Sequence, residues 1–388
     1  MCQNSHMDRY LQAPILNDLP HKIVLLTGPR QCGKTTLAKQ LFPQYDYFNY
    51  DAAEDRLALR EKNWDRQKTL VIFDEIHKMK HWKRWLKGIY DTEGIPPSLL
   101  VTGSARLDVH RKVGDSLAGR YFQYRLHPLD LKEAAQDWKG NDQDLFQRLW
   151  DCSGFPEPFL KGDISYYRRW RRSHTDIILR QDLIDLHSMR DITAIETLVL
   201  LLKNRVGSCV SYAHLARDLE RDANTIKRWL QWLENLYIIF RVTPYSHRIA
   251  RSLLKEPKFY FYDHAYVDHE SGARLENLVA CALYKELHYV EDITGLKTAL
   301  HFLRTKDGKE IDFLICIDHK PAYLIEVKHA DDQPAKEFDY FSKYLPNAVS
   351  LQLVKELRRE KSYPNGVMMR SLIPWLTHIQ LSPAPGEG

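Results

Sequence analysis

Residues 28–35, Gly-Pro-Arg-Gln-Cys-Gly-Lys-Thr, constrain this chain more than any other segment, because they match the phosphate-binding pattern G-x-x-x-x-G-K-[ST]. The apolar run at 23–26 predicts a buried strand before this loop, and residues 36–41 predict the start of a helix after it. In such a layout the glycines let successive N–H groups point at phosphate oxygens, and the helix N-terminus adds its positive dipole end. The sequence therefore predicts a nucleoside triphosphate site in a strand–loop–helix unit.

The residues around this loop receive specific roles from the chemistry of phosphoryl transfer. Lys34 would reach the β- and γ-phosphates of ATP, and Thr35 would hold Mg²⁺. The full set that we expect to contact the nucleotide is Gly28, Pro29, Arg30, Gln31, Cys32, Gly33, Lys34, Thr35, Thr36, Thr102 and Ser104.

A second apolar run ends in two acids, Asp74 and Glu75, as a Walker B strand does. Asp74 would hold Mg²⁺, and Glu75 would orient and polarise the attacking water, which favours a hydrolase over a simple kinase. The next apolar run ends near Thr102 and Ser104, which either sense the γ-phosphate or cap the end of a strand.

Arg120 follows a glycine and is a candidate arginine finger for the charge that develops on the phosphoryl group. Its distance along the chain from the loop predicts that it acts on a neighbouring subunit. A structural, ion-paired arginine is the alternative interpretation.

Composition limits the class of protein. The 388 residues carry a net charge of +5, which permits nucleic-acid binding without requiring it. The six cysteines form no C-x-x-C pair, so neither a zinc site nor a disulfide framework is expected, and a cytoplasmic location fits. No apolar run is long enough to cross a bilayer, so we expect no membrane partner.

The middle of the chain predicts helix, turn, helix and strand over residues 210–242, which is the winged-helix pattern. Asn224 is the expected N-cap of the second helix. The exposed face of that helix and a basic wing would contact DNA, or the module would serve protein contacts alone. The residues concerned are Thr225, Lys227, Arg228 and Gln231 on the helix, and Arg241, His247, Arg248 and Arg251 on the wing.

A β-hairpin is predicted over residues 310–328, with its turn at His319. In that register Asp312 lies opposite Glu326, and Asp312, Glu326 and Lys328 share one face. Two carboxylates and a lysine on one face either hold a cation or form a salt-bridged hairpin.

Taken together, residues 28–37, the Asp74-Glu75 strand, residues 102–104 and residues 117–120 resemble a group of bacterial and archaeal AAA+ ATPases. In that group an AAA+ module is fused to a winged helix and to a C-terminal domain of unknown function similar to PD-(D/E)xK restriction-type nucleases. The resemblance implies assembly into a homo-oligomer, with a hexameric ring as the AAA+ analogy. It also implies that Asp312 and Glu326 bind Mg²⁺, that Lys328 activates water, and that Glu276 is the extra acid from the first helix of the nuclease fold.

The expected fold class is α/β. The expected parts are an AAA+ P-loop core at 7–162, a helical and winged-helix region at 163–245, a nuclease-like α/β domain at 246–380 and a disordered tail at 381–388. The expected function is ATP-driven remodelling or translocation of duplex, forked or four-way DNA, with Mg²⁺-dependent cleavage by the last domain. One alternative is a nucleotide-gated switch or scaffold with a silent nuclease-like domain. A small-molecule kinase is a further alternative, disfavoured by Glu75 and the winged helix.

Overall fold

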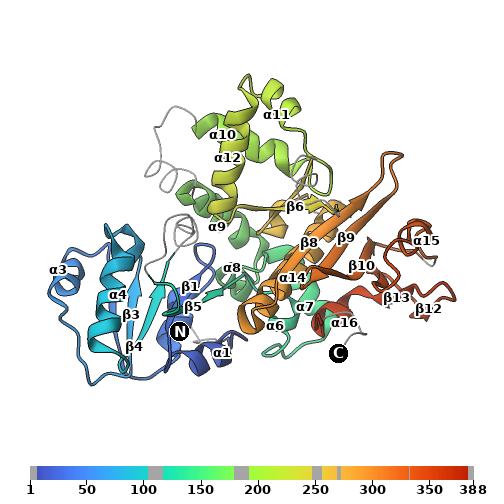
Figure 1. Cartoon of the computed structure of the whole chain (residues 1–388). Helices are drawn as coiled ribbons and strands as arrows, with labels where there is room; N and C mark the ends of the chain where they lie inside the picture. Colours follow the sequence, from blue (N-terminus) through green and yellow to red (C-terminus); the bar gives the residue numbers. More distant parts are fainter. Residues whose placement is uncertain are drawn as a thin grey trace. The chain divides into compact units, whose positions relative to one another are not determined.

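The computed structural model describes residues 7–103, 117–178, 192–246, 256–268, 272–331 and 333–382, which form two compact units (Figure 1). The first unit is Met1–Pro128 with Asn235–Tyr237, and the second is Leu129–Glu234 with Ile238–Gly388. Each unit has its own sheet.

The first unit alternates strands and helices. Its elements in chain order are α1 (Gln12–Asp18), β1 (Ile23–Thr27), α2 (Lys34–Gln40), β2 (Tyr45–Asn49), α3 (Ala53–Glu61), β3 (Leu70–Asp74), η1 (Ile76–Lys78), α4 (Trp82–Glu93), β4 (Ser98–Thr102) and β5 (Tyr121–Arg125). The five strands are all parallel, in the order β2-β3-β4-β1-β5. Because parallel strands end at one edge, the loop after β1 and the acids after β3 lie at the same edge of this sheet.

Burial explains which strands are central. Every residue of β1, β3 and β4 is buried, as continuous apolar runs predict for parallel strands that are covered on both faces. On one face, Trp85 of α4 packs edge-on against Phe73 and Trp64, with ring centroids 5.4 and 6.1 Å away. This aromatic cluster packs against β3, and β3 carries Asp74 at its end.

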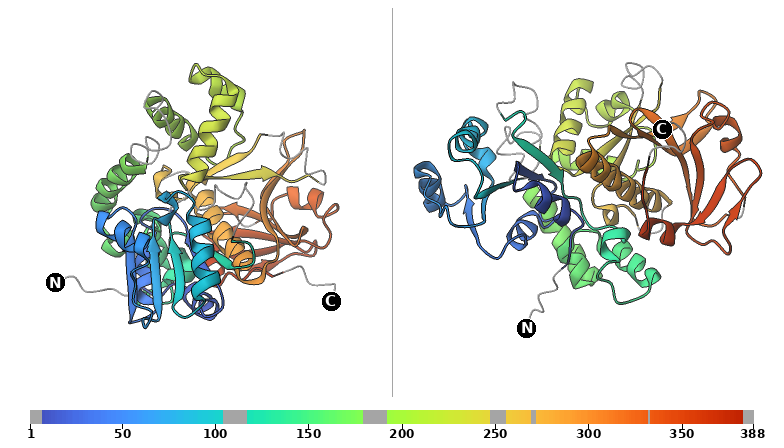
Figure 2. Two further views of the ribbon diagram at one scale, coloured as in Figure 1. Left: turned by 60° about the vertical axis from the view of Figure 1, so that its left-hand side comes forward. Right: turned by 60° about the horizontal axis from the view of Figure 1, so that its bottom comes forward.

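The second unit begins with helices and ends with a mixed sheet. Its elements are α6 (Leu131–Ala134), α7 (Asp142–Cys152), α8 (Pro156–Lys161), α9 (Ile164–Asp176), α10 (Ile192–Lys203), α11 (Tyr212–Asp218), α12 (Ala223–Asn235), β6 (Ile239–Pro244), β7 (Lys258–Phe261), η5 (His264–Tyr266), α14 (Gly272–Thr294), β8 (Thr298–Arg304), β9 (Glu310–Ile317), β10 (Lys320–Lys328), α15 (Glu337–Phe341), β11 (Val349–Val354), β12 (Lys361–Ser362), β13 (Met368–Ser371) and α16 (Leu372–Thr377). Figure 2 shows the long helix α14 lying against this sheet, and α14 contacts β7, β8 and β10.

The eight strands of the second unit run in the order β12-β13-β11-β10-β9-β8-β6-β7. Strand β6, which the sequence groups with the helical region, pairs in parallel with β8 at Thr243 and His301. The expected boundary at 245–246 therefore lies inside one sheet. The reason is that hydrogen bonds between strands distant in sequence, which no local pattern encodes, decide sheet membership.

The helices of the middle region follow the predicted pattern with one correction. Helix α12 begins at Ala223, and the Asp222 carboxylate accepts hydrogen bonds from the Asn224 and Thr225 N–H groups at 2.9 and 3.0 Å. Asp222, rather than the expected Asn224, is therefore the N-cap. Lys227, Arg228 and Gln231 are exposed, as predicted for the outer face, while the predicted wing residues His247, Arg248 and Arg251 lie outside the described residues.

Within the described residues, no helix is both long and apolar enough to cross a membrane.

His264 makes the stability of the second unit pH-dependent. Its buried imidazole Nε2 lies 2.8 Å from the Leu149 carbonyl oxygen, and burial lowers the pKa of the ring to about 4. Because the folded state disfavours the charged ring, stability is full above the unfolded pKa of about 6.5 and is lost as the pH falls toward 4. We expect on the order of 3 kcal/mol of unfolding free energy to be lost over this window.

Urea unfolding at a series of pH values checks this expectation. The variant His264→Gln should show a flatter dependence between pH 6.5 and 4, and His319→Gln, which changes an exposed histidine, should match the wild type. Equal slopes in all three proteins would contradict the assignment.

Candidate functional site

The loop between β1 and α2 has a backbone that only particular residues can adopt. Gly28 has φ 148°, and a Cβ atom there would lie 2.1 Å from the Leu126 carbonyl oxygen, so no other residue fits. Gly33 has φ 96° and is the N-cap of α2. The buried Arg9 links this loop to the segment after β5, because its guanidinium donates to the Cys32 and His127 carbonyl oxygens at 2.8 and 2.5 Å.

Lys34 and Cys32 have different partners. The Lys34 ammonium donates to the Gly28 and Pro29 carbonyl oxygens at 2.9 and 2.6 Å, so it lies against the backbone at the start of the loop. The Cys32 side chain is fully buried, and its thiol points at the Leu126 carbonyl oxygen 3.5 Å away. Cys32 can therefore contribute its backbone N–H to a phosphate, but not its thiol.

Asp74 is the centre of the polar network at this edge. Its Oδ2 accepts hydrogen bonds from the Thr35 and Tyr47 hydroxyls at 2.9 and 2.7 Å, and its Oδ1 accepts one from the Thr102 hydroxyl at 2.6 Å. The network unites β2, β3, β4 and the start of α2. A threonine hydroxyl beside a carboxylate fits Mg²⁺, which prefers oxygen ligands, so Thr35 and Asp74 are the residues that would hold it.

Tyr47 is a member of this network that the sequence analysis did not identify. Burial and the hydrogen bond to Asp74 raise the pKa of its phenol, so the hydroxyl stays a proton donor to the carboxylate. The Lys39 ammonium lies 3.7 Å from the centre of its ring. A tyrosine in a half-buried edge strand carries no local signal for this contact, because the register between β2 and β3 creates it.

Glu75 sits in a left-handed backbone conformation, with φ 55°, directly after β3. Non-glycine residues seldom adopt this conformation, and where they do the position is often functional. The Glu75 N–H donates to the Thr102 carbonyl oxygen at 3.0 Å, and burial raises the pKa of its carboxyl group. A carboxylate that is desolvated and anchored beside Asp74 has the properties of a base for water.

Arg120 lies near the start of β1, at the end of the sheet opposite the phosphate loop. Its carbonyl oxygen accepts from the Ile23 N–H at 3.0 Å, at the start of β1, whereas the phosphate loop follows the end of β1. Its guanidinium is paired with Asp91 through contacts of 2.7 and 3.1 Å. The structure thus does not bring Arg120 to Lys34 within one chain, and a role on a neighbouring subunit stays a prediction. Ser104 lies outside the described residues.

The second candidate site is the hairpin of β9 and β10, and its predicted register is confirmed near the site. Phe313 pairs with Ile325, one step from Asp312 and Glu326, while the register shifts only toward the turn. The Asp312 N–H donates to Glu326 Oε2 at 3.3 Å, and the Val327 N–H donates to Asp312 Oδ2 at 2.9 Å. Lys328 donates to Glu326 Oε1 at 2.7 Å.

Lys258 is the main residue here that sequence reasoning missed. Its side chain is almost fully buried, and its ammonium lies 3.1 Å from Glu276 and 2.6 Å from Glu310. The Tyr260 hydroxyl also donates to Glu276, at 2.5 Å. A lysine at the start of an otherwise apolar strand was the available signal, because a buried charge needs partners.

Glu276 has different partners from the acid pair of Asp312 and Glu326. Burial, Glu276 and Glu326 raise the pKa of Asp312 well above its usual value, and burial also raises the pKa of Glu326. Glu276 is near enough to act on Asp312, but its Oε1 accepts from Lys258 and Tyr260. Its predicted role as a metal ligand stays a prediction.

Asp312 and Glu326 could supply some, but not all, of the ligands of a Mg²⁺ ion. In the part of the chain that the structure describes, no three His, Cys, Asp or Glu side chains are grouped to hold a metal ion. Mg²⁺ often takes only one or two protein carboxylates and fills its other positions with water and substrate phosphate oxygens. Asp312 and Glu326 can supply those two.

Removing the charge of Lys258 should destabilise the second unit. In Lys258→Met the carboxylates of Glu276, Glu310 and Asp312 lose their shared cation, and we expect a loss of about 3 kcal/mol of unfolding free energy. Urea unfolding in EDTA measures this loss, with the exposed Lys361→Met as the control. Divalent cations should restore part of the stability of Lys258→Met, since they neutralise the same acids. A variant as stable as the control would contradict the counter-ion role.

Comparison with known proteins covers most of the chain. Residues 20–135 match a family model described as an AAA domain. Residues 143–276 and 271–370 match two models described as domains of unknown function, DUF8612 and DUF4143.

Relatives in other organisms carry no assigned function. An uncharacterized protein of Mycobacterium tuberculosis is 26% identical over 316 residues, which cover 79% of this chain and 70% of that protein. An uncharacterized protein of Methanocaldococcus jannaschii is 26% identical over 354 residues, covering 82% and 77%. A solved structure of Thermotoga maritima RuvB is similar at 18% identity over 64% of this chain and 96% of that one, but its TM-score of 0.33 adds nothing to the assignment.

The parallel sheet, the phosphate loop and the Asp74 network agree with the AAA-domain match. The first unit therefore has the features of an AAA-type P-loop ATPase domain. The match of residues 271–370 to a domain of unknown function assigns no activity to the second unit.

Proposed function

We propose that this protein hydrolyses ATP and that its second unit acts on DNA. The Asp74 network supports the first half most directly. One carboxylate fixes the Thr35 hydroxyl from the phosphate loop and the Thr102 hydroxyl from the neighbouring strand, and Glu75 is anchored beside it.

The residues of the chain divide the work of hydrolysis. Backbone N–H groups of the loop bind the phosphates, and Lys34 turns from the Gly28 and Pro29 carbonyl oxygens toward the β- and γ-phosphates. Mg²⁺, when bound, neutralises charge on the phosphates. Thr102 keeps Asp74 in place, and Glu75 accepts a proton from the attacking water.

The ATPase rate of the full chain, titrated with single-stranded, duplex, forked and four-way DNA, tests both halves of this proposal. Strong stimulation by one of these would support DNA as the partner. Hydrolysis that no nucleic acid changes would favour the alternative, a nucleotide-gated switch.

For the second unit we propose Mg²⁺-dependent cleavage of phosphodiester bonds. Asp312 and Glu326 would hold the metal ion, and Lys328, whose side chain is 38% exposed, would orient water against the phosphorus atom. The facing positions of Asp312 and Glu326 support this, together with the presence of Glu276 on the preceding helix.

One observation favours a silent domain instead. Glu276, Glu310, Asp312 and Glu326 form an acid cluster around Lys258 and the hairpin. Lys258 already supplies a positive charge to Glu276, so part of this acid cluster is neutralised without metal. Purified protein that cuts no linear, forked or four-way DNA with Mg²⁺ or Mn²⁺ would decide for the silent domain.

A further inference from the structure

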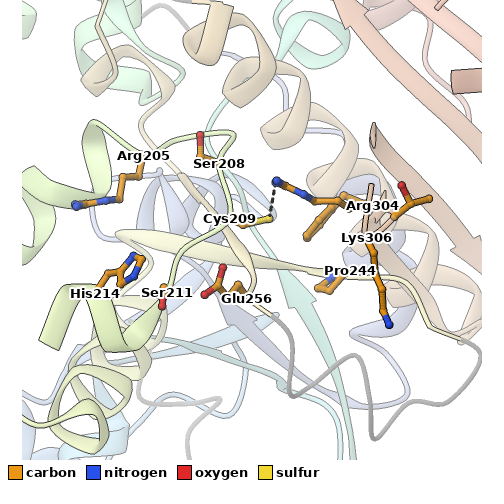
Figure 3. A pocket seen from close by; sticks show the side chains of 11 residues that line it. Arg205, Ser208, Cys209, Ser211, His214, Pro244, Glu256, Arg304 and Lys306 are labelled. Atoms are coloured by element: carbon orange, nitrogen blue, oxygen red, sulfur yellow. Dashed lines mark hydrogen bonds between the residues drawn. The ribbon is translucent and has the colours of Figure 1, made fainter. Parts of the chain in front are cut away.

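A pocket of about 780 Å³ opens within the second unit, beside the acid cluster (Figure 3). One wall is the segment after α10 and the start of α11, with Arg205, Ser208 and His214, and the other is the end of β8 and the residues after it, with Arg304 and Lys306. No residue here belongs to the phosphate loop or to the hairpin pair. The pocket is therefore a site of its own.

The lining of this pocket is basic. The lining includes four basic side chains, Arg205, His214, Arg304 and Lys306, and one acid, Glu256. Arg205 is paired with Asp218 at 2.8 Å and Arg304 with Glu310 at 3.2 Å, whereas Lys306 is exposed and forms no ion pair with the rest of the described chain. A ligand with several negative charges suits Arg205, Arg304 and Lys306.

The pocket is connected to the acid cluster through Glu310. One Glu310 oxygen contacts Arg304 in the pocket wall, and the other contacts Lys258 at 2.6 Å. The opposite wall closes on the same cluster, because a Cβ atom at Gly207 would lie 2.6 Å from Glu276 Oε2. Figure 3 shows Arg304 pointing across to Cys209, whose thiol sulfur accepts its hydrogen bond at 3.3 Å. A ligand in the pocket thus lies next to the acids.

The size of the pocket limits the ligand. Its volume falls within the range of ligand pockets, roughly 300–1,000 Å³, which leaves room for a few nucleotides and not for a duplex. Among the lining residues Phe302 is buried, and the exposed His214 imidazole is the one ring on which a base could stack. Recognition must therefore rely mainly on phosphates.

We propose that this pocket binds a single-stranded segment of DNA through its phosphates, on Lys306, Arg304 and Arg205. The proposal rests on the proposed action of the second unit on DNA and names its substrate as a single strand. Binding of this kind depends strongly on salt and weakly on base sequence.

The test is the binding of a short fluorescein-labelled oligo-dT strand to the full chain, in EDTA and without ATP. Lys306→Glu should weaken binding about tenfold and flatten the salt dependence by about 0.7 in the log–log slope. Lys343→Glu changes an exposed lysine of the same unit outside the pocket and is the matched control; it should stay close to the wild type. Both positions are exposed, so both variants should fold, which thermal unfolding checks.

Competitors distinguish the sources of the phosphate. A blunt duplex should compete poorly, and so should dTMP. An oligo-rU strand that binds like oligo-dT would leave the single-strand proposal intact. Equal losses in both charge variants, a duplex that binds as well as the strand, or dTMP that competes as well as the strand would overturn it.

The outcome separates this inference from the proposed function. Metal-dependent DNA cleavage that Lys306→Glu leaves unchanged would remove the pocket proposal and keep the nuclease. Lys306-dependent strand binding by a protein without cleavage or ATP hydrolysis would keep the pocket and remove the proposed function.

Discussion

Replacing Glu75 with glutamine should abolish ATP turnover while leaving ATP binding close to that of the wild type. Glutamine keeps the size of the side chain but cannot accept a proton from water, and the loss of a positioned base costs about 10²–10⁴ in rate. The backbone bond from residue 75 to the Thr102 carbonyl oxygen does not involve the side chain, so the loop geometry should persist. Single-turnover hydrolysis and equilibrium binding of a fluorescent ATP analogue measure the two quantities.

Glu54→Gln is the control for this variant, since Glu54 is an exposed acid in the first turn of α3. It should hydrolyse ATP at the wild-type rate. If Glu75→Gln kept its rate within a factor of about ten of the wild type, Glu75 would not be the base.

Replacing Asp312 with asparagine should abolish metal-dependent DNA cleavage and leave ATP hydrolysis unchanged. A metal ligand of a phosphodiesterase is expected to contribute several kcal/mol to the transition state, so we expect a loss of about a thousandfold. Stability should be equal or higher. Burial and the neighbouring acids raise the pKa of Asp312, so its ionised form costs folding free energy at neutral pH, and a neutral amide removes that cost.

This combination distinguishes a functional carboxylate from a structural one. A salt-bridged hairpin would lose stability in Asp312→Asn, whereas a metal site would lose cleavage and gain stability. Asp318→Asn, in the turn between the same two strands, is the control and should change neither quantity. Cleavage that persists in Asp312→Asn would show that another site is responsible.

The two sites were predictable to different depths. The phosphate loop and the Asp74-Glu75 strand are continuous segments whose chemistry depends on local backbone geometry, so their place at one sheet edge followed from the pattern. The facing of Asp312 and Glu326 was predictable as well, because a short turn and the two-residue period of a strand determine the register of a hairpin. Arg120 shows the limit: its glycine-arginine motif was visible, but its pairing with Asp91 and its end of the sheet were not.

The sequence by itself therefore determined the nucleotide loop, its acids and the carboxylate pair of the hairpin, since each depends on contacts within or between neighbouring segments. Only the tertiary structure decided that Tyr47 binds Asp74, that Lys258 neutralises Glu276 and Glu310, and that Gly207 closes over the acid cluster. Those contacts join strands and loops that are far apart in the chain. They depend on sheet order and on the burial of charge. A buried charge is stable only where the folded chain brings a partner to it.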